Sequence, residues 1–573
     1  MNNTISFTPI RRFFNLLKVD RQEIISIYIY ALFNGVVALS LPLGIQAIIN
    51  LISGGQVSTS WILLVAFVIA GVAVTGILQI MQLTISENLQ QKILTRAAFE
   101  FAYRIPRMKL EAIDKYYVPE LVNRFFDTLS VQKGLSKILL DFSSASLQVI
   151  FGLILLSLYH PFFILFSFIL VVIVYLIFQF TAPRGLRTSL VESKYKYEVA
   201  HWLEELARTM ETFKLAGNSP LPMNRTDETV EGYLVARKAH FRTLLVQYIN
   251  LVGFKVIIAA GLLLIGGLLV INQQMNIGQF VASEIIIILV LASVEKLILS
   301  METIYDVLTA LEKIGSVTDI PLEKDLDSNI KNTGSGALGI KLKDLSFRFD
   351  DAREDLLSNI NLEIGKGEKL CLSGFDGSGK SVLLNIIAGL YEDFSGSITV
   401  NGISVKNWNK SDLHDRVNDN LAREDIFRGT LLENITLGKP DITPDQLQKI
   451  ADVVGLSDYI DTLPDGYETL LLPEGKHLPR SVILKIKLSR SLIGNPGLIL
   501  FENNFSQLNA SIKQRFLDYL LGLNATVIAI SNDPEVCKAF DRVAVLEKGR
   551  IIANDSLSNL KNYPWYTSIF QKK

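Results

Sequence analysis

The residues best suited to chemistry in this 573-residue chain stand in one run, which reads Gly-Phe-Asp-Gly-Ser-Gly-Lys-Ser from Gly374 to Ser381. An apolar stretch precedes the run and a helical pattern begins at Val382, which predicts a loop between a strand and a helix. Backbone N–H groups of such a loop, together with the helix N-terminus, surround phosphate oxygens. Lys380 supplies a charge for the outer phosphates, and Ser381 a hydroxyl for Mg²⁺. The expected contacts of a bound nucleotide are Gly374, Gly377, Ser378, Gly379, Lys380, Ser381 and Val382.

An aromatic residue upstream of this loop is a candidate for contact with the base. Phe349 follows Phe347 and Arg348 in a segment that alternates strands with turns. Its ring can stack on adenine, or it can be a core residue of an edge strand, and the sequence favours neither role.

The elements that must position this loop belong to the second of two very different halves. Apolar spans crowd the first 300 residues, whereas the rest has the character of a soluble α/β domain, so the length predicts two or more domains. The net charge of −1 gives no global field that would favour nucleic acid. Cys371 and Cys537 lie far apart in the second half, which favours free thiols in a reducing compartment over a disulfide or a metal site.

The first half contains six apolar runs of spanning length, since about 20 helical residues cross a hydrocarbon core of roughly 30 Å. They are Ile24–Ile52, Trp61–Ile85, Ile138–Tyr159, Phe162–Ala182, Gln247–Ile271 and Gly278–Ser300. The connecting segments Ser86–Lys137 and Pro183–Val246 are rich in Lys and Arg, and the short loops between the other runs have none. The positive-inside rule therefore predicts that the basic segments and both termini are cytoplasmic.

The two basic segments have helical character with one break in each, at Ile113–Pro119 and at Gly217–Pro222. Helices of about 25 residues would extend roughly 40 Å beyond the membrane. A long helix, a short crosspiece and a long return helix would transmit motion to a cytoplasmic domain.

Four ionisable residues fall within the spans: Lys255, Glu284, Glu295 and Lys296. Intramembrane charges are candidates for function. Most of these lie near span ends or towards the cytoplasmic side, where snorkelling or the lining of a cavity would also explain them.

Four motifs in order carry a family resemblance: Gly374–Ser381, Phe427–Ile435, Leu488–Pro496 and Val545–Ile551. Together they resemble an ATP-binding cassette, and with six spans before it the chain is similar to a half-transporter of the ABC exporter class. Arg104-Ile105-Pro106 and Glu120–Asp127 resemble the first intracellular loop of that class, especially of its peptide- and protein-secreting branch.

The resemblance implies an α-helical six-span transmembrane domain of type I exporter form with long cytoplasmic extensions, followed by an α/β P-loop NTPase cassette. The expected divisions are a cytoplasmic segment at 1–22, the membrane domain at 23–320, a linker at 321–336 and the cassette at 337–573. It also implies ATP and Mg²⁺ as cofactors and an inner (plasma) membrane location. A homodimer, or a heterodimer with a second half-transporter, is the expected assembly, with ATP held between two cassettes.

Departures from the family pattern concern hydrolysis. The signature segment, usually Leu-Ser-Gly-Gly-Gln, aligns with Leu478, Pro479, Arg480, Ser481 and Val482. Pro479 removes a hydroxyl and an N–H donor, and Arg480 adds bulk where a glycine allows close approach. The guanidinium of Arg480 could instead contact phosphate.

The residues around the expected hydrolytic water also differ. Glu502 keeps a carboxylate that can support Mg²⁺ through water, but Asn503 stands at the position of the general base, and an amide cannot take the proton. Asn532 replaces the switch histidine. The glutamine that usually bridges the metal and the coupling loops aligns near Ala422, and the loop Ser506–Asn509 lacks its usual aspartate. The pattern predicts a degenerate ATPase that binds ATP, unless a carboxylate such as Glu474 or Glu502 restores activity.

Three functions remain open on these residues: an exporter subunit with weak or lost hydrolysis, a non-hydrolysing ATP-binding membrane scaffold or regulator, and a homodimeric exporter with slow turnover. The secretion-branch resemblance favours a peptide, protein or amphipathic lipid as substrate and a periplasmic adaptor protein as partner. Because no protease domain precedes the first span, leader-peptide cleavage by this chain is not expected.

Overall fold

The computed structural model of the chain describes residues 8–53, 59–323, 336–421, 426–502 and 507–570. These residues form two compact units. The first contains Met1–Arg107 and Lys115–Ile320, and the second contains Met108–Asp114 and Pro321–Lys573. The short stretch Met108–Asp114, which the sequence analysis counted with the membrane domain, thus groups with the cassette.

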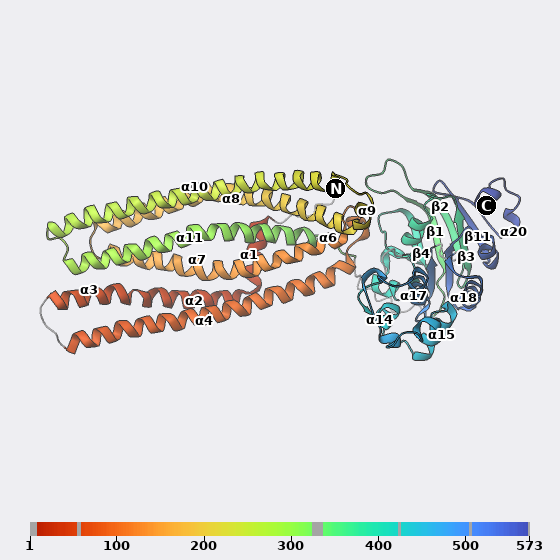
Figure 1. Cartoon of the computed structure of the whole chain (residues 1–573), viewed down its shortest axis with the longest axis horizontal. Helices are drawn as coiled ribbons and strands as arrows, with labels where there is room; N and C mark the ends of the chain where they lie inside the picture. Colours follow the sequence, from red (N-terminus) through yellow and green to blue (C-terminus); the bar gives the residue numbers. More distant parts are fainter. Residues whose placement is uncertain (1–7, 54–58, 324–335, 422–425, 503–506, 571–573) are drawn as a thin grey trace. The chain divides into compact units, whose positions relative to one another are not determined.

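The first unit is a bundle of long helices (Figure 1). Its helices are α1 (Pro9–Val19), α2 (Arg21–Ala38), α3 (Ser40–Ser53), α4 (Thr59–Arg104), α6 (Val118–Asn123), α7 (Asp127–Ser157), α8 (Phe162–Arg208), α9 (Met210–Leu215), α10 (Leu221–Ile271) and α11 (Ile277–Thr318). Among the described residues, six helical stretches are long and apolar enough to cross a membrane. Five contain a predicted apolar run in full, and the third, Val118–Ser157, contains the run Ile138–Tyr159 except for its last two residues. The six-span prediction is therefore confirmed.

The breaks in these helices have local causes. The first span is interrupted at Leu39, between α2 and α3, because Pro42 lacks the N–H that would continue the helical ladder. The first basic segment breaks between Ile113 and Val118, and the second between Leu215 and Leu221. Both breaks fall where the sequence predicted a crosspiece.

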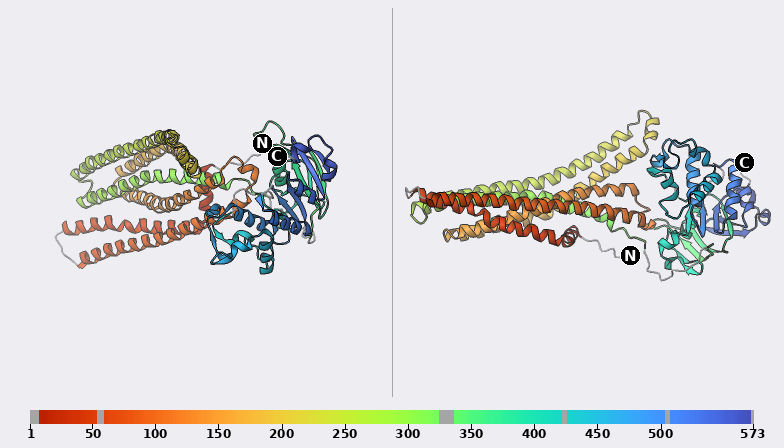
Figure 2. Two further views of the ribbon diagram at one scale, coloured as in Figure 1. Left: turned by 45° about the vertical axis from the view of Figure 1, so that its right-hand side comes forward. Right: turned by 90° about the horizontal axis from the view of Figure 1, so that it is seen from below.

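Small residues set the closest approach within the bundle. Helices α7 and α11 pack along each other, and a Cβ at Gly134 would lie 2.3 Å from Val307 Cγ2. A Cβ at Gly152 would lie 2.7 Å from Val290 Cγ2. Helices α8 and α10 form a second pair, which the views of Figures 1 and 2 show side by side.

The second unit is the α/β cassette. Its strands are β1 (Ile340–Phe347), β2 (Leu357–Ile364), β3 (Lys369–Gly374), β4 (Ser395–Val400), β5 (Ile403–Ser404), β6 (Val417–Asp419), β7 (Gly429–Thr430), β8 (Leu470–Leu471), β9 (Leu498–Phe501), β10 (Thr526–Ile530), β11 (Arg542–Glu547) and β12 (Arg550–Asp555). Its helices are α5 (Leu110–Ile113), α12 (Lys380–Ile387), α13 (Lys410–His414), α14 (Leu431–Thr436), α15 (Pro444–Val454), α16 (Ser457–Ile460), α17 (Arg480–Leu492), α18 (Ala510–Gly522), α19 (Pro534–Ala539), α20 (Leu557–Leu560) and α21 (Tyr566–Phe570).

The strand order of the cassette places the candidate site residues at one edge of its main sheet. The main sheet has the order β12-β11-β3-β10-β9-β6, and β3 runs parallel to both β11 and β10. Strand β9 is parallel to β10, so the carboxyl ends of β3, β9 and β10 share one edge. Ligands bind at this edge in parallel α/β sheets. All residues of β3 are buried, as is typical of a central strand of a parallel sheet.

Candidate functional site

The phosphate-binding loop follows β3 directly and leads into α12, as the sequence predicted. Gly374 has φ +139°, and a Cβ there would lie 2.1 Å from the carbonyl oxygen of Leu546. Gly379 has φ +95° and is the N-terminal cap of α12. These two positions require glycine, so the spacing of the motif reflects the path of the loop.

Lys380 lies across this loop. Its Nζ donates to the carbonyl oxygens of Phe375 at 2.6 Å and Gly374 at 3.0 Å, and it lies 3.3 Å from Ser378 Oγ. Burial lowers the pKa of the Lys380 ammonium, although the nearby carboxylates of Asp376 and Glu502 oppose this effect. A desolvated cation held at a phosphate loop is well placed to meet an incoming anion.

Ser381 and Glu502 face each other. The hydroxyl of Ser381 donates to Glu502 Oε1, although the two residues come from α12 and from the end of β9. The backbone N–H of Glu502 is held by Asn420 Oδ1 at 2.8 Å. The predicted pair of metal-supporting residues is therefore brought together by the fold.

Asn532 binds the start of the loop. Its Oδ1 accepts from Ser373 Oγ at 2.7 Å and from Gly374 N at 3.2 Å, and its Nδ2 donates to Gly374 O at 3.1 Å. An amide can donate and accept in this way on one side, which a single imidazole nitrogen cannot do. The side chain of Asn532 therefore stabilises the position of the first residue of the loop, Gly374.

The other positions around the predicted hydrolytic centre are covered in part. Asn503, Ala422 and Ser506 lie outside the described residues. Asn509 caps α18, since its Oδ1 accepts from Ile512 N at 2.9 Å. Glu474 has a left-handed backbone with φ +59° in a short turn, and its N–H donates to Ile426 O at 2.8 Å.

The signature segment stands at the start of α17. Pro479 is the N-terminal cap, so this helix begins without a polar side chain on its first N–H groups. Pro479, Arg480 and Ser481 are exposed, whereas Val482 is buried and Leu478 packs against the core. The segment therefore presents a proline and an arginine to solvent where the family pattern has a serine and glycines.

Phe349 belongs to an aromatic cluster. Its ring centroid lies 5.0 Å from that of Phe347 and 6.0 Å from that of Tyr391, both in edge-on geometry. The residue is partly buried against the core. Its role in stacking on a base stays a prediction.

The residues of the loop fit a nucleoside triphosphate with Mg²⁺. The loop has a conformation that side chains at Gly374 and Gly379 would prevent, Lys380 supplies the cation, and Ser381 and Glu502 offer two adjacent oxygen ligands of the kind that Mg²⁺ prefers. Mg²⁺ would neutralise phosphate charge there.

An ionic cluster that sequence reasoning missed ties Met108–Asp114 to the rest of the cassette. Glu392 accepts from Lys109 Nζ at 2.6 Å and lies 3.2 Å from Lys410 Nζ. Glu111 accepts from the N–H groups of Glu392 and Asp393. Burial alone would raise the pKa of Glu392, but the two ammonium groups outweigh it and hold the pKa below its usual value. Only the break near Ile113 hinted at this segment in the sequence.

The charges within the spans are paired across helices. Lys255 of α10 and Glu295 of α11 lie 2.5 Å apart, and Lys296 lies 2.9 Å from Asp141 of α7. Glu284 is partly exposed on the same helix as Glu295. The pairs join three helices, which gives these residues a structural role beside any role towards a substrate.

The two cysteines are neighbours in space. Cys371 Sγ and Cys537 Sγ lie 2.9 Å apart, both thiols are free and both side chains are fully buried. Burial raises the pKa of the Cys371 thiol. Distance along the sequence was therefore a poor guide to their separation, because β3 and α19 bring them together.

Comparison with known proteins matches both units. The family described as "ABC transporter transmembrane region" matches residues 24–294, and the family described as "ABC transporter" matches residues 357–502. A solved structure of a bacterial Atm1-family ABC exporter with ATP bound has a TM-score of 0.85 at 17% identity, over 96% of this chain and 98% of that chain. The likeness shows a shared fold.

The curated relatives match this chain over only part of their own length. The alpha-hemolysin translocation ATP-binding protein HlyB of Escherichia coli O157:H7 is 27% identical over 355 residues, covering 61% of this chain and 50% of HlyB. The transport/processing ATP-binding protein ComA of Streptococcus pneumoniae is 23% identical over 444 residues, covering 77% of this chain and 62% of ComA. The chain thus spans less than two thirds of the length of these relatives. With both family matches on one polypeptide and an exporter fold, the chain belongs to the ABC transporters, as a half-transporter that joins a transmembrane region to an ATP-binding cassette.

Proposed function

We propose that this half-transporter binds Mg²⁺-ATP and exports a peptide, a protein or an amphipathic lipid, with weak or lost hydrolysis at its own cassette. The observation that carries the proposal is the contrast between the complete phosphate loop and Asn532, which is bonded to Gly374 at the back of that loop. ATP binding is supported by the loop geometry and by the adjacent Ser381 and Glu502.

Weak hydrolysis is supported by three replacements at positions that the family pattern assigns to ATP hydrolysis. Asn503 cannot act as a base, and loss of a positioned base typically costs on the order of 10²–10⁴-fold in rate. Asn532 is engaged with the loop, and Pro479 leaves the start of α17 without the hydroxyl of the family signature.

The proposed substrate, a peptide, protein or amphipathic lipid, is supported by the relatives, by the first intracellular loop and by charged residues within the spans. HlyB and ComA are described as a translocation protein and as a transport and processing protein. The segments Arg104–Pro106 and Glu120–Asp127 of this chain resemble the first intracellular loop of the peptide- and protein-secreting branch. The paired charges between α7, α10 and α11 are compatible with a polar cargo path.

The proposal extends to assembly and location. It has the chain in the inner (plasma) membrane with both termini cytoplasmic, as a homodimer or as a heterodimer with a second half-transporter, with a periplasmic adaptor protein as a further partner. We propose that the functional parts of the chain are the cytoplasmic segment 1–22, the membrane domain 23–320, the linker 321–336 and the cassette 337–573. Met108–Asp114 groups with the cassette.

The test compares ATP binding with phosphate release in reconstituted protein, using the parent chain, Asn503→Glu and Lys380→Ala. We expect about one ATP per chain, little phosphate release from the parent, and faster release from Asn503→Glu. Lys380→Ala is the control for binding through the loop. Slow release by the parent that is abolished only in Lys380→Ala, together with cargo movement, would favour the homodimeric exporter with slow turnover. Binding without release in any variant, and without cargo movement, would favour a scaffold or regulator.

A further inference from the structure

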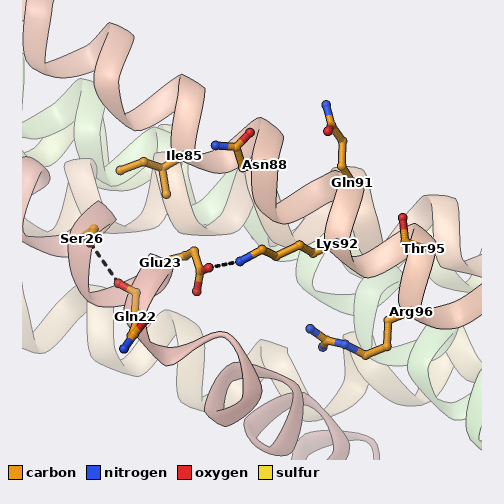
Figure 3. A pocket seen from close by; sticks show the side chains of 9 residues that line it. All are labelled: Gln22, Glu23, Ser26, Ile85, Asn88, Gln91, Lys92, Thr95 and Arg96. Carbon is orange, nitrogen blue, oxygen red and sulfur yellow. Dashed lines mark hydrogen bonds and ion pairs between the residues drawn. The ribbon is translucent and has the colours of Figure 1, made fainter.

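A polar cavity of about 720 Å³ lies in the first unit between the start of α2 and the middle of α4. Figure 3 shows its lining side chains, with Glu23 and Lys92 directed at each other and Arg96 extended towards the open space. The lining residues are Gln22, Glu23, Ser26, Ile85, Asn88, Gln91, Lys92, Thr95 and Arg96.

The cavity begins where two spans end. The apolar run of the first span starts at Ile24, and that of the second ends at Ile85. Helix α1, which precedes α2, lies across the long helices (Figure 1). It exposes Ile10, Phe14 and Val19 and carries Arg11, Arg12 and Lys18, the composition of a helix that lies in a membrane interface. The cavity therefore lies at headgroup depth, on the cytoplasmic side if the proposed orientation holds.

The two cations of the cavity have donors to spare. Arg96 gives two hydrogen bonds to the buried carboxylate of Asp20, at 2.8 and 3.2 Å, while a guanidinium has five N–H donors. Lys92 donates to Glu23, while an ammonium has three donors. The side chains of Lys92 and Arg96 are 54% and 42% exposed. An anion with several acceptor oxygens can bind both without breaking either pair.

The surface above the cavity is apolar. Ile29 and Phe33 are exposed on α2, one and two turns beyond Ser26, and Ile77 and Met81 are exposed on α4, before Ile85. At hydrocarbon depth these side chains contact acyl chains. Cations below an apolar surface match an amphiphile with a phosphate head.

We infer that this cavity binds the phosphate group of a cytoplasmic-leaflet phospholipid, through Lys92 and Arg96. Asp20 and Glu23 hold the two cations in place through their ion pairs, and the remaining N–H donors of Lys92 and Arg96 point to the phosphate. Glu23 can also meet an ammonium on the same headgroup. The bound lipid joins the α1–α2 corner to α4. The cytoplasmic side rests on the proposed orientation, whereas the chemistry does not depend on ATP.

Native mass spectrometry of the detergent-purified full chain with added palmitoyl-oleoyl phosphatidylglycerol or phosphatidylethanolamine tests this inference. We expect lipid retention to be about tenfold weaker in Lys92→Gln/Arg96→Gln, since a lost charged hydrogen bond has roughly that effect. The matched control is Arg184→Gln/Arg187→Gln, which removes two exposed cations of α8 that directly follow the apolar run Phe162–Ala182. Equal retention in parent and cavity variant, or an equal loss in the control, would overturn the inference.

A second variant separates binding from folding. Thr95→Trp places an indole in the cavity beside Lys92 and Arg96 and leaves both ion pairs intact, so it should weaken lipid retention while keeping the thermal unfolding temperature. Inorganic phosphate is the competitor arm: no displacement at millimolar concentration is expected, and displacement would assign the cavity to free phosphate. ATP binding measured on the same samples should be the same in the parent and in the cavity variants. If the proposed function is wrong, ATP binding or hydrolysis will show it, whereas lipid retention tests only the present inference.

Discussion

Asn532 and Gly374 exchange two hydrogen bonds, one in each direction, at 3.2 and 3.1 Å. Lys380 donates to the same Gly374 carbonyl oxygen at 3.0 Å. The residue at the switch position and the residue that would hold phosphate therefore meet at one backbone group, which makes the conformation of the loop dependent on both.

Asn532→Ala should destabilise the nucleotide-free cassette. It removes three hydrogen bonds, and a loss of about 1–3 kcal/mol is expected from an unsatisfied buried group. For a domain of this size that corresponds to roughly 2–12 °C in the unfolding temperature. Differential scanning fluorimetry without nucleotide measures it. Asn559→Ala, which removes an exposed amide bonded to Asp555, should change little; a similar drop in both variants would argue against the described role.

Glu392→Gln should weaken the attachment of Met108–Asp114 to the cassette. The variant loses charged hydrogen bonds from Lys109 and an ion pair with Lys410, which cost about 1.5–3 kcal/mol. Because the folded-state pKa of Glu392 is lowered, its stabilisation is present above the unfolded pKa and is lost as pH falls through the folded pKa. The difference in unfolding temperature between parent and variant should therefore shrink on acidification from pH 7 to below pH 4. A difference that grows on acidification would contradict this sign.

Both cysteines should resist thiol reagents in the folded protein. Cys371 and Cys537 are fully buried, and burial raises the pKa of Cys371, so little reactive thiolate is present at neutral pH. We expect a chromogenic disulfide reagent to detect almost no thiol in the native chain and two in denaturant. Rapid labelling of the native chain would show that β3 and α19 open readily.

The pair of Lys255 and Glu295 should respond to a charge swap. Either single change, Lys255→Glu or Glu295→Lys, places like charges together in the bundle and should lower the yield of folded protein. The double swap restores attraction and should recover part of it. The same swap at the exposed pair Lys341 and Glu363 should have almost no effect, since exposed pairs contribute about 0–1 kcal/mol. Gel filtration in detergent provides the readout, and no recovery in the double variant would exclude a pairing role.

Much of the architecture follows from local patterns. Apolar length fixed the six spans, and the glycine spacing of the loop reflects backbone angles at Gly374 and Gly379 that few other residues adopt. Contacts between distant segments could not be predicted in the same way. The pair Ser381 with Glu502 was expected from the family resemblance. The pairs Lys109 with Glu392 and Cys371 with Cys537 were not predicted, because they depend on strand order and on the packing of whole elements, which no short window of sequence encodes.

The central claim is that the cassette holds a triphosphate and leaves it intact. The most direct measurement incubates purified, reconstituted protein with ATP and Mg²⁺, removes free nucleotide and identifies what stays bound by chromatography. The account predicts that the bound nucleotide is ATP, close to one per chain, after many minutes. Bound ADP with matching phosphate release, from a sample free of any second cassette protein, would contradict it.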